Sequence, residues 1–211
     1  MKFLIEVAEP RHVVFAEAIC KEMEESAKVR GTGIAKRSPL YIEMKMKEGK
    51  SVIALDEKGK FAGFAYIESW SHEKFVANSG LIVRPEYRKS GLARKIKRRI
   101  FELSRKKFPN AKIFGITTSL AVMKINSDLG YKPVTFSELT QDEIFWKGCE
   151  ACCNFDILTR NKYRMCLCTA MLYDPEQRHG AFDFVKKINL LKRFRRIFSV
   201  SLPNGRKDSS D

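Results

Sequence analysis

The sequence predicts a sheet of the α/β or α+β class, flanked by helices. Apolar, β-branched runs alternate along the chain with segments whose apolar residues recur at helical spacing. Two of the runs, residues 51–55 and 61–70, are joined by a short polar turn containing Gly59, which is typical of a hairpin. With 211 residues and 44% hydrophobic content, the chain can bury one sizeable core, or one core and a small appendage.

The N-terminal elements have clear boundaries. Residues 3–7 form an apolar run that we expect to be the first strand. Pro10 opens a helix that extends to about residue 29, and Ser38 followed by Pro39 is a favourable start for a second helix, which Gly49 ends.

The following elements continue this alternation. We expect a strand over 75–83, a helix over 91–107, a strand over 112–118 and a helix over 120–129. The helix over 91–107 places apolar residues at helical spacing, so its many cations, Lys97 among them, are expected on a solvated outer face.

The segment between residues 83 and 92 is suited to holding phosphates. Pro85 ends a strand, a basic loop follows, and a helix then begins. The first N–H groups of a helix lack internal partners, and the helix dipole adds positive potential there. Gly91 allows close approach to the backbone, and Arg88, Lys89 and Arg94 bring positive charge. An ordinary strand–turn–helix with a solvated loop is the alternative.

This loop resembles a family signature. Arg88-Lys89-Ser90-Gly91-Leu92-Ala93 is similar to the R/Q-x-x-G-x-G/A motif of the GCN5-related N-acetyltransferases (GNAT), which grip the pyrophosphate of an acyl-coenzyme A. The stretch from Asn126 to Lys132 resembles the end of the last core helix of that family. The resemblance covers residues 1–134 and implies a mixed, mostly antiparallel sheet flanked by helices. The overall likeness is to amino-acid (glutamate) N-acyltransferases.

The resemblance also implies which residues bind acetyl-CoA, or another acyl-CoA, as co-substrate. In the family, the strand before the loop pairs with the pantetheine arm, and the loop holds the pyrophosphate. The residues carried over are Leu81, Ile82, Val83, Arg88, Lys89, Ser90, Gly91, Leu92, Ala93, Arg94 and Asn126.

Amine acetylation needs a base, because an ammonium has no lone pair with which to attack a thioester. Glu68 stands near the end of an apolar strand, and burial there would make it a stronger base. We therefore expect Glu68 to be the catalytic base, with Glu73 and His72 as the next candidates. A surface charge at the strand end is the alternative for Glu68.

The chain departs from the family where a Tyr often protonates the leaving thiolate. Counting back from Gly130-Tyr131, Asn126 stands at that position and Ser119 at the usual Asn position. Asn cannot give up a proton near neutral pH. The general acid is therefore left unassigned.

The link between the first two helices borders the acceptor pocket in the resembled family. Arg30, Lys36 and Arg37 lie in this link and could bind an acidic acceptor. Solvated loop charges are the equal alternative.

Beyond residue 134 the family pattern ends. We expect residues 137–178 to be a cysteine-rich extension that forms a hairpin and completes or flanks the sheet. The cysteines form a Cys149-x-x-Cys152 pair and a Cys166-x-Cys168 pair, a spacing compatible with structural zinc on four thiolates. Reduced thiols buried in a hairpin, or a redox pair, are the alternatives. The second pair weakens the zinc hypothesis, because side chains two apart in a strand lie about 6–7 Å apart.

The C-terminal region differs in composition. Residues 179–202 have the pattern of a basic amphipathic helix that could lie on a membrane, an acidic partner or its own domain. Residues 203–211 are polar and predicted to be a disordered tail. We therefore expect a core over 1–136, the extension over 137–178, this helix and this tail.

Charge and cysteine content complete the prediction. Forty Lys and Arg against 25 Asp and Glu give a net charge of +15, which favours anionic partners. Six cysteines without a signal peptide or a membrane span indicate a cytoplasmic protein. We expect an acetyl-CoA-dependent enzyme of amino-acid metabolism that acetylates a small acidic amine, and a homodimer is left open. A protein or polyamine acceptor is the alternative, as is a non-catalytic nucleic-acid or ribosome-binding module, although no nucleic-acid motif is present.

Overall fold

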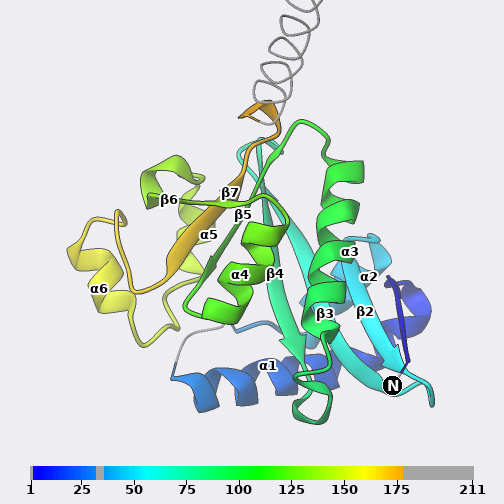
Figure 1. Ribbon diagram of the computed structural model, residues 1–211. Coiled ribbons are helices and arrows are strands. Elements are labelled where there is room, and N and C mark those ends of the chain that lie inside the picture. The colour runs from blue at the N-terminus through cyan, green and yellow to red at the C-terminus, as the bar shows by residue number, and fades with distance from the viewer. Residues whose placement is uncertain (1, 32–35, 178–211) are drawn as a thin grey trace, which may run out of the picture. The chain divides into compact units, whose positions relative to one another are not determined.

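The computed structural model describes residues 2–31 and 36–177, so the predictions for 179–202 and 203–211 lie outside it. The elements below belong to one compact unit, Met1–Asp174. Its sheet has seven strands (Figure 1). Their spatial order is β1 (Phe3–Val7), β2 (Ser51–Asp56), β3 (Phe61–Trp70), β4 (Phe75–Val83), β5 (Lys112–Thr117), β7 (Thr169–Tyr173) and β6 (Lys132–Val134).

Helices cover both faces of this sheet. The helices α3 and α4 lie on one face, and α1 and α2 cover the other (Figure 1). The bounds are α1 (Ala16–Arg30), α2 (Pro39–Lys47), α3 (Leu92–Lys107), α4 (Leu120–Asp128), α5 (Glu143–Lys147) and α6 (Phe155–Arg160). Short 3₁₀ helices at Pro10–Phe15, Pro85–Tyr87 and Phe136–Glu138 complete the described elements.

The strand sequences account for a sheet that is buried on both faces. Successive side chains of a strand point to opposite faces. Val52 and Ile67 therefore pack in the cluster that includes α3, while Ile53, Phe64 and Tyr66 pack against α1 and α2. The two faces of β2 and β3 are thus equally apolar, and this explains their continuous hydrophobic runs.

The strands β4 and β5 form the parallel pair of the sheet, and they separate soon after they meet. Their pairing joins Phe75–Ala77 to Lys112–Phe114, whereas β4 continues to Val83. The register of β4 against β3 also shifts around Gly80, where an added Cβ would lie 2.3 Å from the Tyr66 ring and would force that ring to move. The result is an opening in the middle of the sheet.

The predicted mixed, mostly antiparallel sheet with flanking helices is confirmed. The hairpin expected across the cysteine-rich extension is wrong. Residues 155–160 form α6, because Phe155 and Leu158 lie on one helical face that packs inward, and β7 alone is a strand in this segment. Lys162 and Tyr163, at positive φ, follow the helix end instead of making a hairpin turn.

Candidate active site

A cleft of about 600 Å³ occupies the opening between β4 and β5. Residues 77–81 of β4 line one side of it and residues 114–117 of β5 line the other. Residues of α2, α3, α4 and the α5–α6 region also reach its walls. The cleft therefore receives side chains from both faces of the sheet.

Glu68 lies in this cleft and is 5% exposed. Its Oε1 accepts hydrogen bonds from Tyr41 Oη at 2.6 Å and Arg37 Nη2 at 3.1 Å, while its Oε2 accepts one from Ser79 Oγ at 2.7 Å. Burial next to the Glu68 charge raises the pKa of the Tyr41 hydroxyl, which therefore remains a donor. The carboxylate is thus held by three donors, as a buried charge requires.

Arg37 is the predicted acceptor-binding cation that the fold brings to Glu68. Its guanidinium also donates from Nε to Tyr66 Oη at 3.0 Å, and its side chain is 19% exposed. Lys36 borders the cleft but pairs with Glu24 at 3.5 Å in an exposed position. The side chain of Arg30 lies outside the described residues.

The reserve candidates for the base lie elsewhere. His72 and Glu73 occupy the turn between β3 and β4, at positive φ, and both are exposed. Neither lines the cleft. Among the three predicted bases, Glu68 is therefore the one with access to the interior of the site.

The basic loop presents backbone N–H groups at the start of α3. Gly91 stands at the N-cap with φ of +79°, and an added Cβ there would meet no heavy atom within 4 Å. Lys89 also has positive φ, at +64°, and its side chain pairs with no described residue. Such a left-handed turn before a 16-residue helix leaves the first amides free for an anion.

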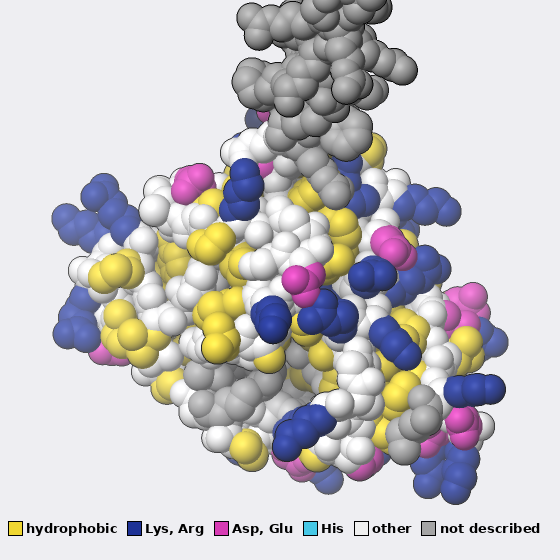
Figure 2. Space-filling view, viewed as in Figure 1, with side chains coloured by type: hydrophobic (Ala, Val, Ile, Leu, Met, Phe, Trp, Pro, Cys, Tyr) yellow, Lys and Arg dark blue, Asp and Glu magenta, His cyan; other side chains and the backbone are white. Residues whose placement is uncertain are grey.

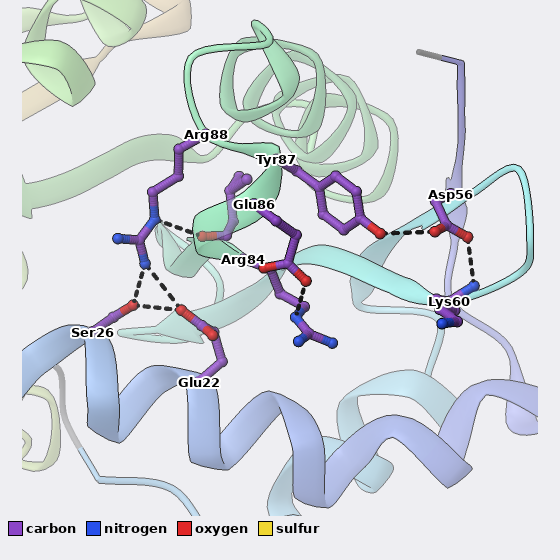
Figure 3. A network of polar contacts seen from close by, with 9 residues as sticks. Glu22, Ser26, Asp56, Lys60, Arg84, Glu86, Tyr87 and Arg88 are labelled. Atoms are coloured by element: carbon purple, nitrogen blue, oxygen red, sulfur yellow. Dashed lines mark hydrogen bonds and ion pairs between the residues drawn. The ribbon is translucent and has the colours of Figure 1, made fainter.

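Arg88 is placed differently from the simplest expectation for a phosphate ligand (Figure 3). Its guanidinium donates to Glu22 Oε1 and Ser26 Oγ of α1, each at 3.0 Å, and to the Val83 carbonyl. In this arrangement the side chain anchors the loop to α1. Direct contact between the Arg88 guanidinium and a pyrophosphate stays a prediction.

Two more contacts fix the ends of the loop. Tyr87 Oη donates to Asp56 Oδ2 at 2.7 Å, which ties the loop to the β2–β3 turn (Figure 3). Arg94 forms an ion pair with Asp128 of α4. Of the three predicted cationic side chains, Lys89 is therefore the one without an ionic partner among the described residues.

Lys97 contradicts the expectation that it faces solvent. It is 2% exposed, it lines the cleft, and burial lowers its pKa to about 7. Ile96 and Ile100 belong to the buried stripe of α3, and position 97 extends this stripe toward the opening between β4 and β5. In the sequence, Lys97 follows directly after Ile96 of the apolar stripe. The buried face of α3 is therefore one residue wider than its apolar residues indicate.

Asn126 lies near Lys97 at the same face. Its Nδ2 donates to Met171 Sδ at 3.7 Å, while its buried Oδ1 has no hydrogen-bond partner among the described residues. Trp70 Nε1 is likewise buried and unpaired there. Both residues line the cleft, so each is available to a ligand.

The four cysteines proposed for zinc line the cleft, and all are free, partly buried thiols: Cys149, Cys152, Cys166 and Cys168. Burial raises the pKa of Cys149 to about 11 and that of Cys168 to about 12. Within residues 2–31 and 36–177, no three His, Cys, Asp or Glu side chains are arranged to hold a metal ion. The zinc prediction is therefore unsupported, and buried thiols describe these residues better.

A family model matches the segment that builds this site. The model of the Acetyltransferase (GNAT) family matches residues 21–122, from α1 through the loop to α4. The predicted resemblance to the GNAT family is therefore confirmed over these residues, which make up just under half of the chain, and the match supports the predicted N-acetyltransferase class. No curated protein sequence matches this chain significantly.

Solved structures share the fold at low sequence identity. N-acetylglutamate synthase from Neisseria gonorrhoeae, complexed with coenzyme A and N-acetyl-glutamate, is 16% identical with a TM-score of 0.58 over 82% of this chain. The match spans only 35% of that synthase. Rv2747 from Mycobacterium tuberculosis, in complex with CoA and NLQ, is 15% identical with a TM-score of 0.56, over 81% of this chain and 98% of that one.

A third similar structure is a phosphinothricin acetyltransferase from Sinorhizobium meliloti in complex with AcCoA. It is 15% identical with a TM-score of 0.56, over 82% of this chain and 89% of that one. Separately, no helix in the described part of the chain is long and apolar enough to span a membrane.

Proposed function

We propose that the protein transfers an acetyl group from acetyl-CoA to the amine of a small carboxylate-bearing metabolite, such as an amino acid, by direct attack on the thioester. The observation that carries this proposal is the cleft between β4 and β5, which has Glu68 in its wall. The Gly91 loop, which follows β4 in the chain, begins α3. The matched family and the CoA complexes of the similar folds support it.

The cofactor half of the proposal assigns the pyrophosphate to the loop. The backbone N–H groups of residues 89–94 and the Lys89 ammonium supply donors and positive charge. Residues 81–83 of β4 and Asn126 are assigned to the pantetheine arm. Arg88 supports this half through its bonds to Glu22 and Ser26, which hold the loop in place.

The acceptor half rests on the ion pair between Arg37 and Glu68. A buried pair of opposite charges is complementary to a zwitterion, whose ammonium would approach Glu68 and whose carboxylate would approach Arg37. The unpaired Trp70 N–H offers another donor in the same cleft. The similar N-acetylglutamate synthase is complexed with N-acetyl-glutamate, an acetylated amino acid, which supports this class of acceptor.

The chemistry requires the acceptor nitrogen to lose a first proton before the attack, and its second proton to water after the nitrogen–carbon bond forms. Glu68, directly or through one water, takes the first proton so that the nitrogen lone pair can attack the acetyl carbon. The three donors around its carboxylate then position the base. Once the ammonium arrives, it replaces part of the positive charge that Arg37 provides in the free enzyme.

Release of free thiol from acetyl-CoA across a panel of amines tests the proposal. The panel contains acidic, neutral and apolar amino acids, polyamines and peptide N-termini. We expect carboxylate-bearing small amines to give the highest kcat/KM. Turnover with peptides or polyamines alone would replace the acceptor assignment. The absence of thiol release with every amine would overturn the proposed function.

The nucleic-acid alternative predicts a concentrated basic surface. Figure 2 shows the Lys and Arg side chains spread over the visible face among acidic and apolar ones. This distribution gives that alternative no specific support on this face.

A further inference from the structure

The cleft contains a second ionisable group, on the sheet face opposite Glu68. Glu68 joins residues from α2, while Lys97 projects from α3, which packs on the other face. Both line the same opening between β4 and β5. A thioester lying in this opening would therefore have one ionisable side chain on each side.

The environment of Lys97 is polar, and it contains no counter-ion from residues 2–31 and 36–177. A Cβ added to Gly115 would lie 3.9 Å from Lys97 Nζ, 4.0 Å from Asn126 Nδ2 and 3.9 Å from the Asn78 carbonyl oxygen. These three polar groups thus converge over the one β5 residue that lacks a side chain. The missing side chain leaves room at this point of the cleft.

The remaining neighbour of Lys97 is an aromatic ring. Its Nζ lies 5.3 Å from the centroid of Tyr131, and no carboxylate pairs with it in the described part of the chain. Tyr131 donates its hydroxyl proton to Asn78 Oδ1 at 3.0 Å, and burial raises the pKa of that hydroxyl, so it remains neutral. The groups from β4, β5 and α4 that meet at this point with Lys97 are the Asn78 backbone carbonyl, Gly115 and the Asn126 amide, and none of them is charged.

We propose that Lys97 is the general acid that protonates the departing thiolate of coenzyme A, a role for which the chain has no Tyr at position 126. This inference rests on the proposed acetyl transfer. Asn126 stands beside Lys97, with its unpaired Oδ1 available to accept a hydrogen bond from the thiol or the pantetheine amide. The position of Lys97 in the sequence does not indicate this role, because Lys97 lies in α3 and Asn126, at the position of the family Tyr, lies in α4.

The proton and electron movements balance with these two side chains and water. The amine nitrogen bonds to the acetyl carbon, the carbon–sulfur bond breaks, and its electron pair leaves on sulfur. Glu68 takes the proton that the acceptor ammonium loses before the attack, and water takes the second proton of that nitrogen after the bond forms. The Lys97 ammonium gives a proton to sulfur. Lys97 then regains a proton from water as coenzyme A departs. The lowered pKa of Lys97, about 7, lies below the ~8.5 of an ordinary thiol, so the transfer is favourable.

Binding of coenzyme A and of desulfo-coenzyme A, measured by calorimetry from pH 6 to 9, tests the contact with sulfur. We expect the wild-type protein to prefer the thiol form by about tenfold, the worth of a charge-assisted hydrogen bond. Lys97→Met should bind both forms equally. Lys106→Met, an exposed lysine on the same helix, is the matched control and should keep the preference.

The pH profile of kcat is the second readout. Wild-type kcat should fall above about pH 7 as Lys97 loses its proton, and Lys97→Met should lose this limb together with ~10²-fold in kcat at pH 7. If Lys97→Met does not fold, Lys97→Gln takes its place. The comparison of coenzyme A with desulfo-coenzyme A in the wild-type protein needs no variant.

The outcomes separate this inference from the function on which it rests. No binding of acetyl-CoA to the wild-type protein would remove both. Acetyl transfer that survives Lys97→Met with unchanged kcat, profile and thiol preference would remove only the inference. Acetylation of Lys97 itself by acetyl-CoA, detected by peptide mass spectrometry, would also overturn it, because the amine would then be an acceptor.

Discussion

Lys97 illustrates how the environment of one residue decides its chemistry. An ammonium in a helix normally reaches water, but this one lies over the opening of the sheet and loses its hydration. Desolvation favours the neutral amine. The helical pattern of the sequence does not predict this burial, because it depends on the sheet beneath the helix. Its neighbours 95, 98 and 99 have similar side chains and are exposed.

The pH dependence of stability follows from this shift. The folded pKa of Lys97 is about 7 and the unfolded value about 10.4, so between these pH values the unfolded state binds more protons. The contribution of Lys97 to the free energy of unfolding is therefore least favourable below pH 7, and it rises with pH from 7 toward 10. Lys97→Met removes this dependence.

Chemical denaturation of the two proteins between pH 6 and 9.5 measures the effect. The wild-type free energy of unfolding should rise relative to Lys97→Met by up to ~1.4 kcal/mol per pH unit above pH 7. A difference between the two proteins that stays constant across this range would show that Lys97 remains charged in the folded protein.

Glu68 is the residue on which the proposed base chemistry depends. Glu68→Gln keeps the size and removes the proton acceptor, so kcat should fall by ~10²–10⁴-fold. The loss should shrink at alkaline pH, where more of the free amine is already deprotonated. Affinity for acetyl-CoA should be unchanged, since the Gly91 loop that is assigned the pyrophosphate makes no contact with Glu68.

Glu73→Gln is the matched control for this variant, because Glu73 is an exposed carboxylate in the next turn. It should leave kcat and its pH profile unchanged. If Glu68→Gln instead retains full kcat while Glu73→Gln does not, the base lies in the turn rather than in the cleft.

At the scale of elements, the loop between β4 and α3 can be tested with a pair of glycines. Gly91 and Gly59 both have positive φ, +79° and +73°, and an added Cβ would meet nothing within 4 Å at either. Substitution by Val should therefore strain both turns similarly. Only Gly91 lies at the proposed pyrophosphate site.

Calorimetric titration with acetyl-CoA distinguishes the two variants. Gly91→Val should lose affinity by at least about tenfold, because the new side chain occupies the space through which the phosphates approach, whereas Gly59→Val should bind normally. Circular dichroism checks that both remain folded. Equal affinities in the two folded variants would contradict the assignment of this loop.

The segment containing α5 and α6 presents thiols of different reactivity. Cys153 is exposed, whereas burial raises the pKa of Cys149 and Cys168. Because the thiolate is the reactive form, iodoacetamide at pH 8 should alkylate Cys153 more than about tenfold faster than these two. Peptide mass spectrometry over time measures the rates, and equal rates would mean that the α5–α6 segment opens to solvent.

For the whole molecule, sequence patterns predicted those helices, strands and turns whose formation depends on residues close together in the chain. The β2–β3 hairpin and the β4–loop–α3 unit follow from alternation, turn residues and Gly91, and they lie where expected. Glu68 stands near the end of an apolar strand in the sequence, and it lines the cleft, while its role as the base stays a prediction. Its triple hydrogen bonding was not predicted, because Arg37, Tyr41 and Ser79 come from three separate segments.

The features that prediction missed depend on long-range packing. Strand β7 inserts between β5 and β6. The paired strands β6 and β7 are therefore separated in the sequence by the whole α5–α6 segment. The burial of Lys97 depends on where β4 and β5 separate, and the anchoring of Arg88 depends on α1. None of these partners is near in sequence, so residue spacing carries no information about them.

Transfer of isotopically labelled acetyl from acetyl-CoA tests the central claim most directly. The protein is incubated with ¹³C-acetyl-CoA and the amine panel, and the products are identified by mass spectrometry. We predict labelled amide on a small carboxylate-bearing amine, with one coenzyme A thiol released per acetyl transferred and with Glu68→Gln strongly impaired. Label that remains on acetyl-CoA with every amine, in protein that is folded, would contradict the claim.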